Sequence, residues 1–100
     1  MLINKMRMIH PGEILLEEFI KPLGITASAL ALALRVPAPR INDVVRQKRS
    51  VTPDTALRLA RYFGTTAQFW MNLQATYDLK HTEADNGQAI TRDIQPLEQV

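Results

Sequence analysis

Cysteine is absent from this chain of 100 residues, and aromatic residues and long apolar runs are scarce. Without cysteine the protein can form neither a disulfide nor a thiolate metal site, which is typical of proteins from a reducing cytoplasm. No apolar run long enough for a signal peptide follows Lys5 and Arg7, and no stretch approaches the roughly 18 apolar residues of a membrane helix. We therefore expect a soluble, cytoplasmic protein with no membrane partner.

The net charge of +2 hides a division along the chain. Residues 1–80 contain eleven Lys or Arg and six Asp or Glu, a balance of +5, whereas residues 81–100 contain one and four, a balance of −3. A basic body favours a polyanionic partner, and an acidic terminal segment is typical of a solvated tail or an interaction arm. The length and the 46% content of apolar residues suit a single domain with one modest core.

Prolines, glycines and capping residues divide residues 10–80 into five predicted helices. Pro11 opens the first helix, and Pro22 and Gly24 end it. Thr26 caps the second, and the same signals predict further helices over residues 37–46, 53–63 and 67–80. The apolar spacing predicts a core that includes Ile14, Leu15, Phe19, Ile20, Leu30, Ala31, Leu34, Ile41, Val44, Val45, Ala56, Leu57, Leu59, Ala60 and Phe63.

The end of the chain carries no sustained apolar period. The pattern of the fifth helix fades near Lys80, Asn86-Gly87 is a turn signal, and Pro96 interrupts what remains. We therefore expect the last fifteen to twenty residues to be poorly ordered when the chain is alone.

The most informative stretch runs from Thr26 to Arg49, where two short helices are joined by a tight turn. Five basic residues and one acidic residue, Asp43, lie between Arg35 and Arg49. A helix-turn-helix places its second helix in the major groove, and this basic bias suits a phosphate backbone. We predict an all-α helix-turn-helix DNA-binding domain at residues 10–80, between a flexible arm at residues 1–9 and an acidic tail at residues 81–100.

Side chains of the third helix that point away from the core are the candidates for reading bases: Arg40, Asn42, Asp43 and Arg46. Arginine pairs with O6 and N7 of guanine, and asparagine with N6 and N7 of adenine. Gln47, Lys48, Arg49 and Ser50 in the next loop are candidates for phosphate contacts, which carry no sequence information. The alternative is that these side chains form an ordinary solvated face.

Two features invite an enzymatic interpretation, and their spacing argues against both. His10 and His81 lie seventy-one residues apart, so they cannot form a helical metal pair with each other. Glu13, Glu17 and Glu18 are typical of the exposed face of an amphipathic helix, with no nucleophile or phosphate loop to accompany them. We expect no enzyme activity, no metal and no cofactor.

The fifth helix carries a wide apolar stripe formed by Phe69, Trp70, Leu73 and Tyr77. Such a stripe can complete the core, or part of it can form a two-fold contact with a second copy, since helix-turn-helix proteins commonly dimerise to match half-sites. We assign these four residues to a homodimer interface, with a purely core role as the alternative.

Three segments together resemble one family: HPGEILLEEFIKPLGI at residues 10–25, the helix-turn-helix at 26–46, and VTPDTALRLARYFGTTAQFWMNLQATYDL at 51–79. The chain resembles the HigA-type (VapI-like) antitoxins of the XRE, or phage-repressor-like, helix-turn-helix class. The resemblance covers about seventy residues and implies a lambda-repressor-like fold of about five helices. It also implies a homodimer that represses its own operon by binding a double-stranded DNA operator, and that neutralises a HigB-like toxin, an mRNA-cleaving ribonuclease of the RelE-like fold.

The resemblance maps the recognition helix onto residues 37–46 and leaves two questions open. Its DNA-facing positions are Pro37, Ala38, Pro39, Arg40, Asn42 and Asp43, to which we add Thr26, Arg46, Lys48 and Arg49. Ala38 and Pro39 stand where the class often has polar base readers. Arg35 replaces the usual turn glycine, so the turn is either strained by about 1 kcal/mol or differs slightly in geometry.

A toxin partner is not required by the fold, and three kinds of protein remain possible. The first is an antitoxin and autorepressor, the second is a stand-alone transcriptional regulator, and the third is a protein-interaction adaptor without DNA binding. An antitoxin needs an acidic or apolar surface for a cationic ribonuclease. We prefer the first helix, with Glu13, Leu16, Glu17 and Glu18, and the N-terminal arm. The alternative is the tail, with Glu83, Asp85, Asp93 and Glu98, and we rank it second because an ordered surface loses less entropy on binding.

Overall fold

The computed structural model describes residues 7–98, and every regular element in this range is helical. The elements are α2 (Pro11–Ile14), the π-helical η1 (Leu15–Ile20), α3 (Lys21–Leu23), α4 (Ala27–Leu34), α5 (Ala38–Val45), α6 (Pro53–Phe63) and α7 (Ala67–Asp93). Because α2, η1 and α3 follow one another without a break, they form one rod, and the described residues hold five helices in all. The predicted all-α class and helix number are confirmed.

The first rod widens into a π-helix directly before Pro22. In a regular α-helix, a proline ring clashes with the carbonyl four residues earlier and removes one hydrogen bond. In η1 the backbone pairs at the wider spacing, as in the bond from the N–H of Lys21 to the carbonyl of Leu16, and such a turn accommodates the proline. The rod ends at Gly24, with φ of 68°, so the prediction that Pro22 helps to end it is wrong.

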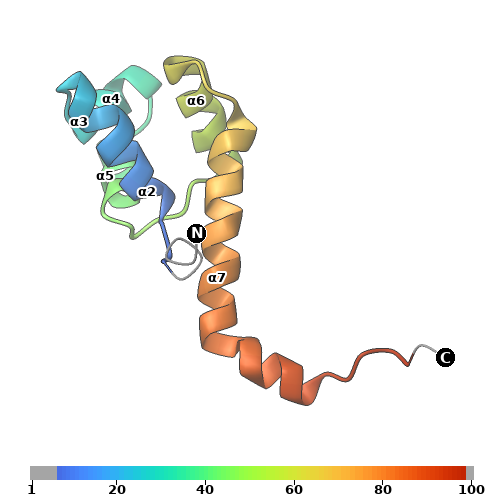
Figure 1. Ribbon diagram of the computed structural model, residues 1–100. Helices are drawn as coiled ribbons and strands as arrows, with labels where there is room; N and C mark the ends of the chain where they lie inside the picture. The colour runs from blue at the N-terminus through green and yellow to red at the C-terminus, as the bar shows by residue number, and fades with distance from the viewer. Residues whose placement is uncertain (1–6, 99–100) are drawn as a thin grey trace.

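All five helices contribute to one core, and α4 packs on α5 while α6 packs on α7 (Figure 1). The fully buried apolar side chains include Leu15, Leu30, Ile41, Val44, Ala56, Leu59 and Trp70. Leu57 was also predicted to be buried, and it is 63% exposed. It lies about 100° around α6 from Ala56, at the flank of the buried stripe.

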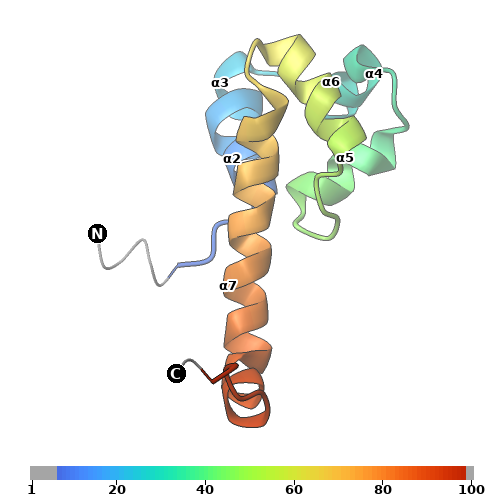
Figure 2. The same cartoon turned by 90° about the vertical axis from the view of Figure 1, so that its right-hand side faces the viewer.

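The long helix α7 leaves the domain at its C-terminal end. Figure 2 shows its first half along the body and its second half projecting away. It continues past Lys80 to Asp93 with Asn86 and Gly87 inside it, so the predicted end near Lys80 is wrong. Loss of apolar periodicity removes the buried face but not the helix, which extends at low cost once nucleated. The pair between His81 and Asp85, 3.2 Å apart, also supports this extension.

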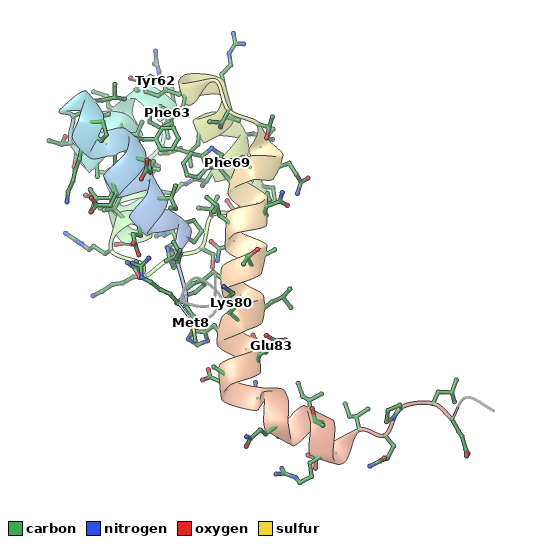
Figure 3. The ribbon with its side chains drawn as sticks, viewed as in Figure 1. Met8, Tyr62, Phe63, Phe69, Lys80 and Glu83 are labelled. Carbon is green, nitrogen blue, oxygen red and sulfur yellow. The ribbon has the colours of Figure 1, made fainter. Side chains whose placement is uncertain are left out.

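Of the predicted arm at residues 1–9, residues 1–6 lie outside the described range. The guanidinium of Arg7 pairs with the carboxylate of Glu13. The carbonyl oxygen of Arg7 accepts a hydrogen bond from Nζ of Lys80 at 3.5 Å, and in Figure 3 Lys80 lies on the side of α7 that faces Met8. Arg7 therefore has defined contacts with both α2 and α7.

Candidate nucleic-acid interface

α4 and α5 form the helix-turn-helix. α4 begins after Thr26, whose hydroxyl accepts the N–H of Ala29 at 3.0 Å, as a helix cap should. It ends in a left-handed turn at Arg35, with φ of 63°, where the N–H groups of Arg35 and Val36 return to carbonyls of the last turn at 3.1 and 3.0 Å. Gly24 ends the first rod in the same way. Arg35 therefore takes a conformation that suits glycine, which is the strained alternative and costs about 1 kcal/mol.

The recognition helix α5 turns its apolar side inward and its polar side outward. Ile41 and Val44 have no exposed surface. Pro37 is the residue before the helix, in extended conformation, so only Pro39 of the two prolines lies within the first turn. Pro37 and Pro39 are exposed, whereas Ala38 is half-buried and packs against the core.

Arg40 is held to the start of α6 in the unbound chain. Its guanidinium pairs with the carboxylate of Asp54, which also accepts Nε of Arg58 at 2.8 Å. These hydrogen bonds, from Arg58 first and then Arg40, hold the pKa of Asp54 below its usual range. Arg58 also donates to the carbonyl of Leu34 at 2.9 Å. Because Arg58 remains beside Asp54, Arg40 can leave that carboxylate without stranding it.

Asn42 joins the two helices of the motif. Its Nδ2 donates to the hydroxyl of Ser28 at 3.2 Å and to the carbonyl of Ala38 at 3.0 Å. A primary amide has two N–H groups, so both are engaged here. To pair with adenine through both atoms of its amide, Asn42 must give up these bonds, and in the free chain it fixes α5 against α4.

Three cations gather at the C-terminal end of α5. The carboxylate of Asp43 lies 3.3 Å from Nη2 of Arg49 and 3.9 Å from Nη1 of Arg46, whose side chain is 66% exposed. The helix ends in a second left-handed turn at Gln47, with φ of 65°, and the N–H groups of Gln47 and Lys48 return to its last turn at 2.9 and 2.8 Å. Asp43 therefore holds two arginines together at the exposed C-terminal end of α5.

A glycine in α2 sets the position of α5, a role that the sequence analysis missed. A Cβ on Gly12 would lie 1.8 Å from the carbonyl oxygen of Val44, so only glycine permits this approach. The N–H of Gly12 donates to Nδ1 of buried His10 at 2.8 Å, and the His10 ring meets that of Tyr77 edge-on, with centroids 4.8 Å apart. Burial lowers the pKa of His10, although the carboxylate of Asp78 opposes this shift. A histidine directly before Pro11 was the available signal for this cap.

A buried glutamine is the other residue that the sequence analysis missed. Gln74 of α7 is 4% exposed, and its Oε1 accepts the N–H of Val51 at 2.7 Å. Val51 directly follows the exposed basic loop, so α7 holds one end of that loop. No periodic pattern indicates which buried position of a helix is polar.

Of the predicted dimer residues, Trp70 is buried in the core, Phe69 is exposed, and Leu73 and Tyr77 are half-buried. Trp70 has no exposed surface, and its Nε1 donates to the hydroxyl of Thr65 at 2.8 Å. Its assignment to an interface is therefore wrong, because its packing is satisfied within one chain. Phe69, Leu73 and Tyr77 line a groove of about 280 Å³ between α7 and the first rod, together with Arg7, Ile9, Ile14, Asn72, Thr76 and Lys80.

Within residues 7–98, no three His, Asp or Glu side chains gather so that they could hold a metal ion. No helix in that range is both long and apolar enough to span a membrane.

The two short helices, their tight turn and the cations at the end of the second helix define a helix-turn-helix protein of the DNA-binding class. Residues 16–70 match a family model described as helix-turn-helix. The chain is 60% identical over 82 residues to virulence-associated protein I of Dichelobacter nodosus, which covers 82% of this chain and 76% of that protein. It is 34% identical over 94 residues to antitoxin HigA-1 of Vibrio cholerae, covering 94% and 88% of the two chains.

Solved structures give the same result. The Pseudomonas aeruginosa antitoxin HigA, solved with the higBA promoter, has 53% sequence identity and a TM-score of 0.90, over 92% of this chain and 100% of that one. The chain belongs to the HigA-type, VapI-like antitoxin family of helix-turn-helix proteins.

Proposed function

We propose that this protein binds operator DNA in its own promoter with α5 and the loop after it, and so represses its own operon. The observation that carries the proposal is the division of α5 into a buried apolar side and an exposed end where Arg46, Lys48 and Arg49 gather. The related HigA structure with promoter DNA supports it. The proposed DNA-binding set is Thr26, Pro37, Ala38, Pro39, Arg40, Asn42, Asp43, Arg46, Lys48 and Arg49.

A direct test compares two duplexes of equal length, one from the promoter and one with its sequence scrambled, by fluorescence anisotropy. The proposal requires tighter binding to the promoter duplex. Equal Kd values for the two duplexes would contradict specific operator binding and would indicate that the protein binds any polyanion.

Within the DNA-binding set, we propose that Arg40 and Asn42 discriminate bases. The shared carboxylate of Asp54 makes Arg40 available to the groove, whereas Asn42 must exchange its bonds to Ser28 and Ala38. Each alanine substitution should cost about 1 to 3 kcal/mol at one position of the site and little on random DNA. Binding-site selection with each variant measures this, and recovery of the parent motif by both would move readout to DNA shape.

We propose that the functional unit is a homodimer, as the two-fold symmetry of most operators requires. Phe69, Leu73 and Tyr77 remain the proposed interface, now without Trp70, because Phe69 is 38% exposed beside an apolar groove. Sedimentation of Phe69→Asp should give a folded monomer. A folded dimer of normal mass would exclude this face.

We also propose that the protein neutralises a HigB-like ribonuclease that cleaves mRNA. The structure argues against the surface on the first helix that the sequence favoured. Glu13 pairs with Arg7 and Glu17 pairs with Lys21. Leu16 is half-buried against the core. The stretch beyond Lys80 is helical to Asp93. Because it is already ordered, it would lose little conformational entropy on binding the toxin. We therefore favour residues 81–98 as the toxin-binding segment and 10–80 as the DNA-binding domain.

Co-expression with the adjacent toxin separates these surfaces. A chain ending at Lys80 should lose the rescue of growth, whereas Leu16→Lys with Glu17→Lys should keep it. The opposite result would return the toxin to the first helix, and full rescue by both would mean that neither stretch is essential.

A stand-alone regulator of the same family is the alternative function, and it predicts operator binding without any toxin encoded beside the gene. An adaptor without DNA binding is disfavoured by the cations at the end of α5. We propose that the protein acts by binding and not by catalysis, without a cofactor, in the cytoplasm where its DNA is found.

A further inference from the structure

The basic loop after the recognition helix, residues 46–50, is fixed at both ends. At its start, the left-handed turn at Gln47 directs the chain away from α5, and Val44 in the last turn of α5 is seated on Gly12. At its other end, Val51 is 2% exposed and begins the approach to α6. Between these points the five residues of the loop are exposed, so the position of their side chains depends on where the two ends are held.

The second end is held by a side chain from a different helix. Oε1 of Gln74, in α7, accepts the N–H of Val51 at 2.7 Å, across 23 residues of sequence. Nε2 of the same amide donates to Oδ1 of Asp78 at 2.9 Å, one turn further along α7. Because Asp78 can only accept when ionised, it fixes which atom of the amide faces Val51.

The residue type at position 74 follows from this geometry. A buried backbone N–H needs an acceptor, and an apolar side chain of the same size would supply none. A glutamate would supply an acceptor but would place a second carboxylate beside Asp78. Glutamine alone satisfies both neighbours in this arrangement.

We infer that Gln74 is a positioning residue for DNA binding, which sets the register of the phosphate-contacting loop through the N–H of Val51. This inference rests on the proposed function, because it assumes that Lys48 and Arg49 contact phosphates. Gln74 itself is buried and touches no DNA. Gln74 therefore acts by determining how many cations of the loop contact DNA phosphates at the same time.

The test is Gln74→Met, which keeps the length and volume of the side chain and removes the acceptor. Gln68→Met is the matched control, since Gln68 lies on the same helix and donates to Asn72 at 2.8 Å on the exposed surface. Anisotropy with the promoter duplex is measured across a range of salt concentrations, at a temperature where circular dichroism shows each variant folded. Gln74→Met should lose about tenfold in affinity, the loss of one charge-assisted contact, and the slope of log K against log salt should fall by about 1.

A reversed pair provides the rescue. Gln74→Glu alone should also weaken binding, because its carboxylate is repelled by that of Asp78. Gln74→Glu with Asp78→Asn removes this repulsion and leaves one acceptor toward Val51 and one donor between the two side chains. The double variant should recover most of the affinity and the parent salt slope. It also keeps the inference testable if Gln74→Met does not fold, because the single and double glutamate variants can then be compared.

Four results decide the matter. If the parent binds the promoter duplex and Gln74→Met binds with the same Kd and slope, the inference is wrong and the proposed function stands. An equal loss in Gln68→Met, or no recovery in the reversed pair, also overturns the inference. If the parent itself fails to bind the duplex, the proposed function fails and the inference fails with it.

Discussion

Replacing Gly12 by alanine should destabilise the protein and weaken its DNA binding together. The new Cβ would lie 1.8 Å from the carbonyl oxygen of Val44 and 2.8 Å from its carbonyl carbon, whereas ordinary contacts begin at 3.4 Å. Because both obstructing atoms belong to the backbone, α2 and α5 would have to separate by about 1.6 Å, and close-packed interiors do not absorb such a shift freely. Overpacking of this kind costs about 1 to 3 kcal/mol. We expect the free energy of unfolding to fall by about 2 kcal/mol, which lowers the Tm of a domain of this size by about 8 to 16 °C.

Thermal unfolding followed by circular dichroism gives the Tm, and anisotropy with the promoter duplex gives the Kd. Gly87→Ala is the matched control, because its Cβ would meet nothing closer than the Cβ of Glu83 at 3.8 Å. Alanine at this helical position should stabilise the protein by up to about 1 kcal/mol. A Gly12→Ala protein with the Tm and Kd of the parent would refute the argument that this contact places α5. An equal loss of Tm in Gly87→Ala would attribute the effect to loss of a glycine in general.

Three further predictions concern the stability of the protein and its binding to DNA. Burial lowers the pKa of His10, so its neutral ring stabilises the folded protein fully above about pH 6.5, the pKa of histidine in the unfolded chain. This contribution to the free energy of unfolding should be lost as the pH falls toward the folded pKa, because the unfolded chain takes up the proton first. In His10→Asn, the urea midpoint should no longer show this fall at low pH. If the midpoint of the variant varies with pH as that of the parent does, another group causes the fall. Arg35→Gly should raise the free energy of unfolding by about 1 kcal/mol by relieving the left-handed turn, and a lower urea midpoint would contradict that strain. Charge reversal at Lys48 and Arg49 should weaken binding to promoter and random duplexes alike and reduce the salt slope by about 1 per lost contact, whereas an unchanged slope would remove both from the phosphate-contacting set.

The starts of α4, α6 and α7 could be read from the sequence because their cause is local. The hydroxyls of Thr26, Thr52 and Thr66 each accept an N–H three residues ahead, at 3.0, 3.3 and 3.1 Å, as their place before each helix predicts. The inward faces followed from spacing in the same way, as at Ile41 and Val44. Both signals depend on residues within one or two turns of one another, so no knowledge of packing is needed to interpret them.

The site itself depends on contacts between residues that are distant in the sequence. Arg40 was predicted to face bases, and the structure pairs it with Asp54, fourteen residues away. The amide of Gln74 reaches Val51, and only close packing of α2 on α5 gives Gly12 its role. The sequence by itself therefore determined where three of the helices begin, most of the buried faces and the basic character of the loop. Only the tertiary structure decided which side chains hold α5 and that loop in place, because those partners become neighbours when the helices pack.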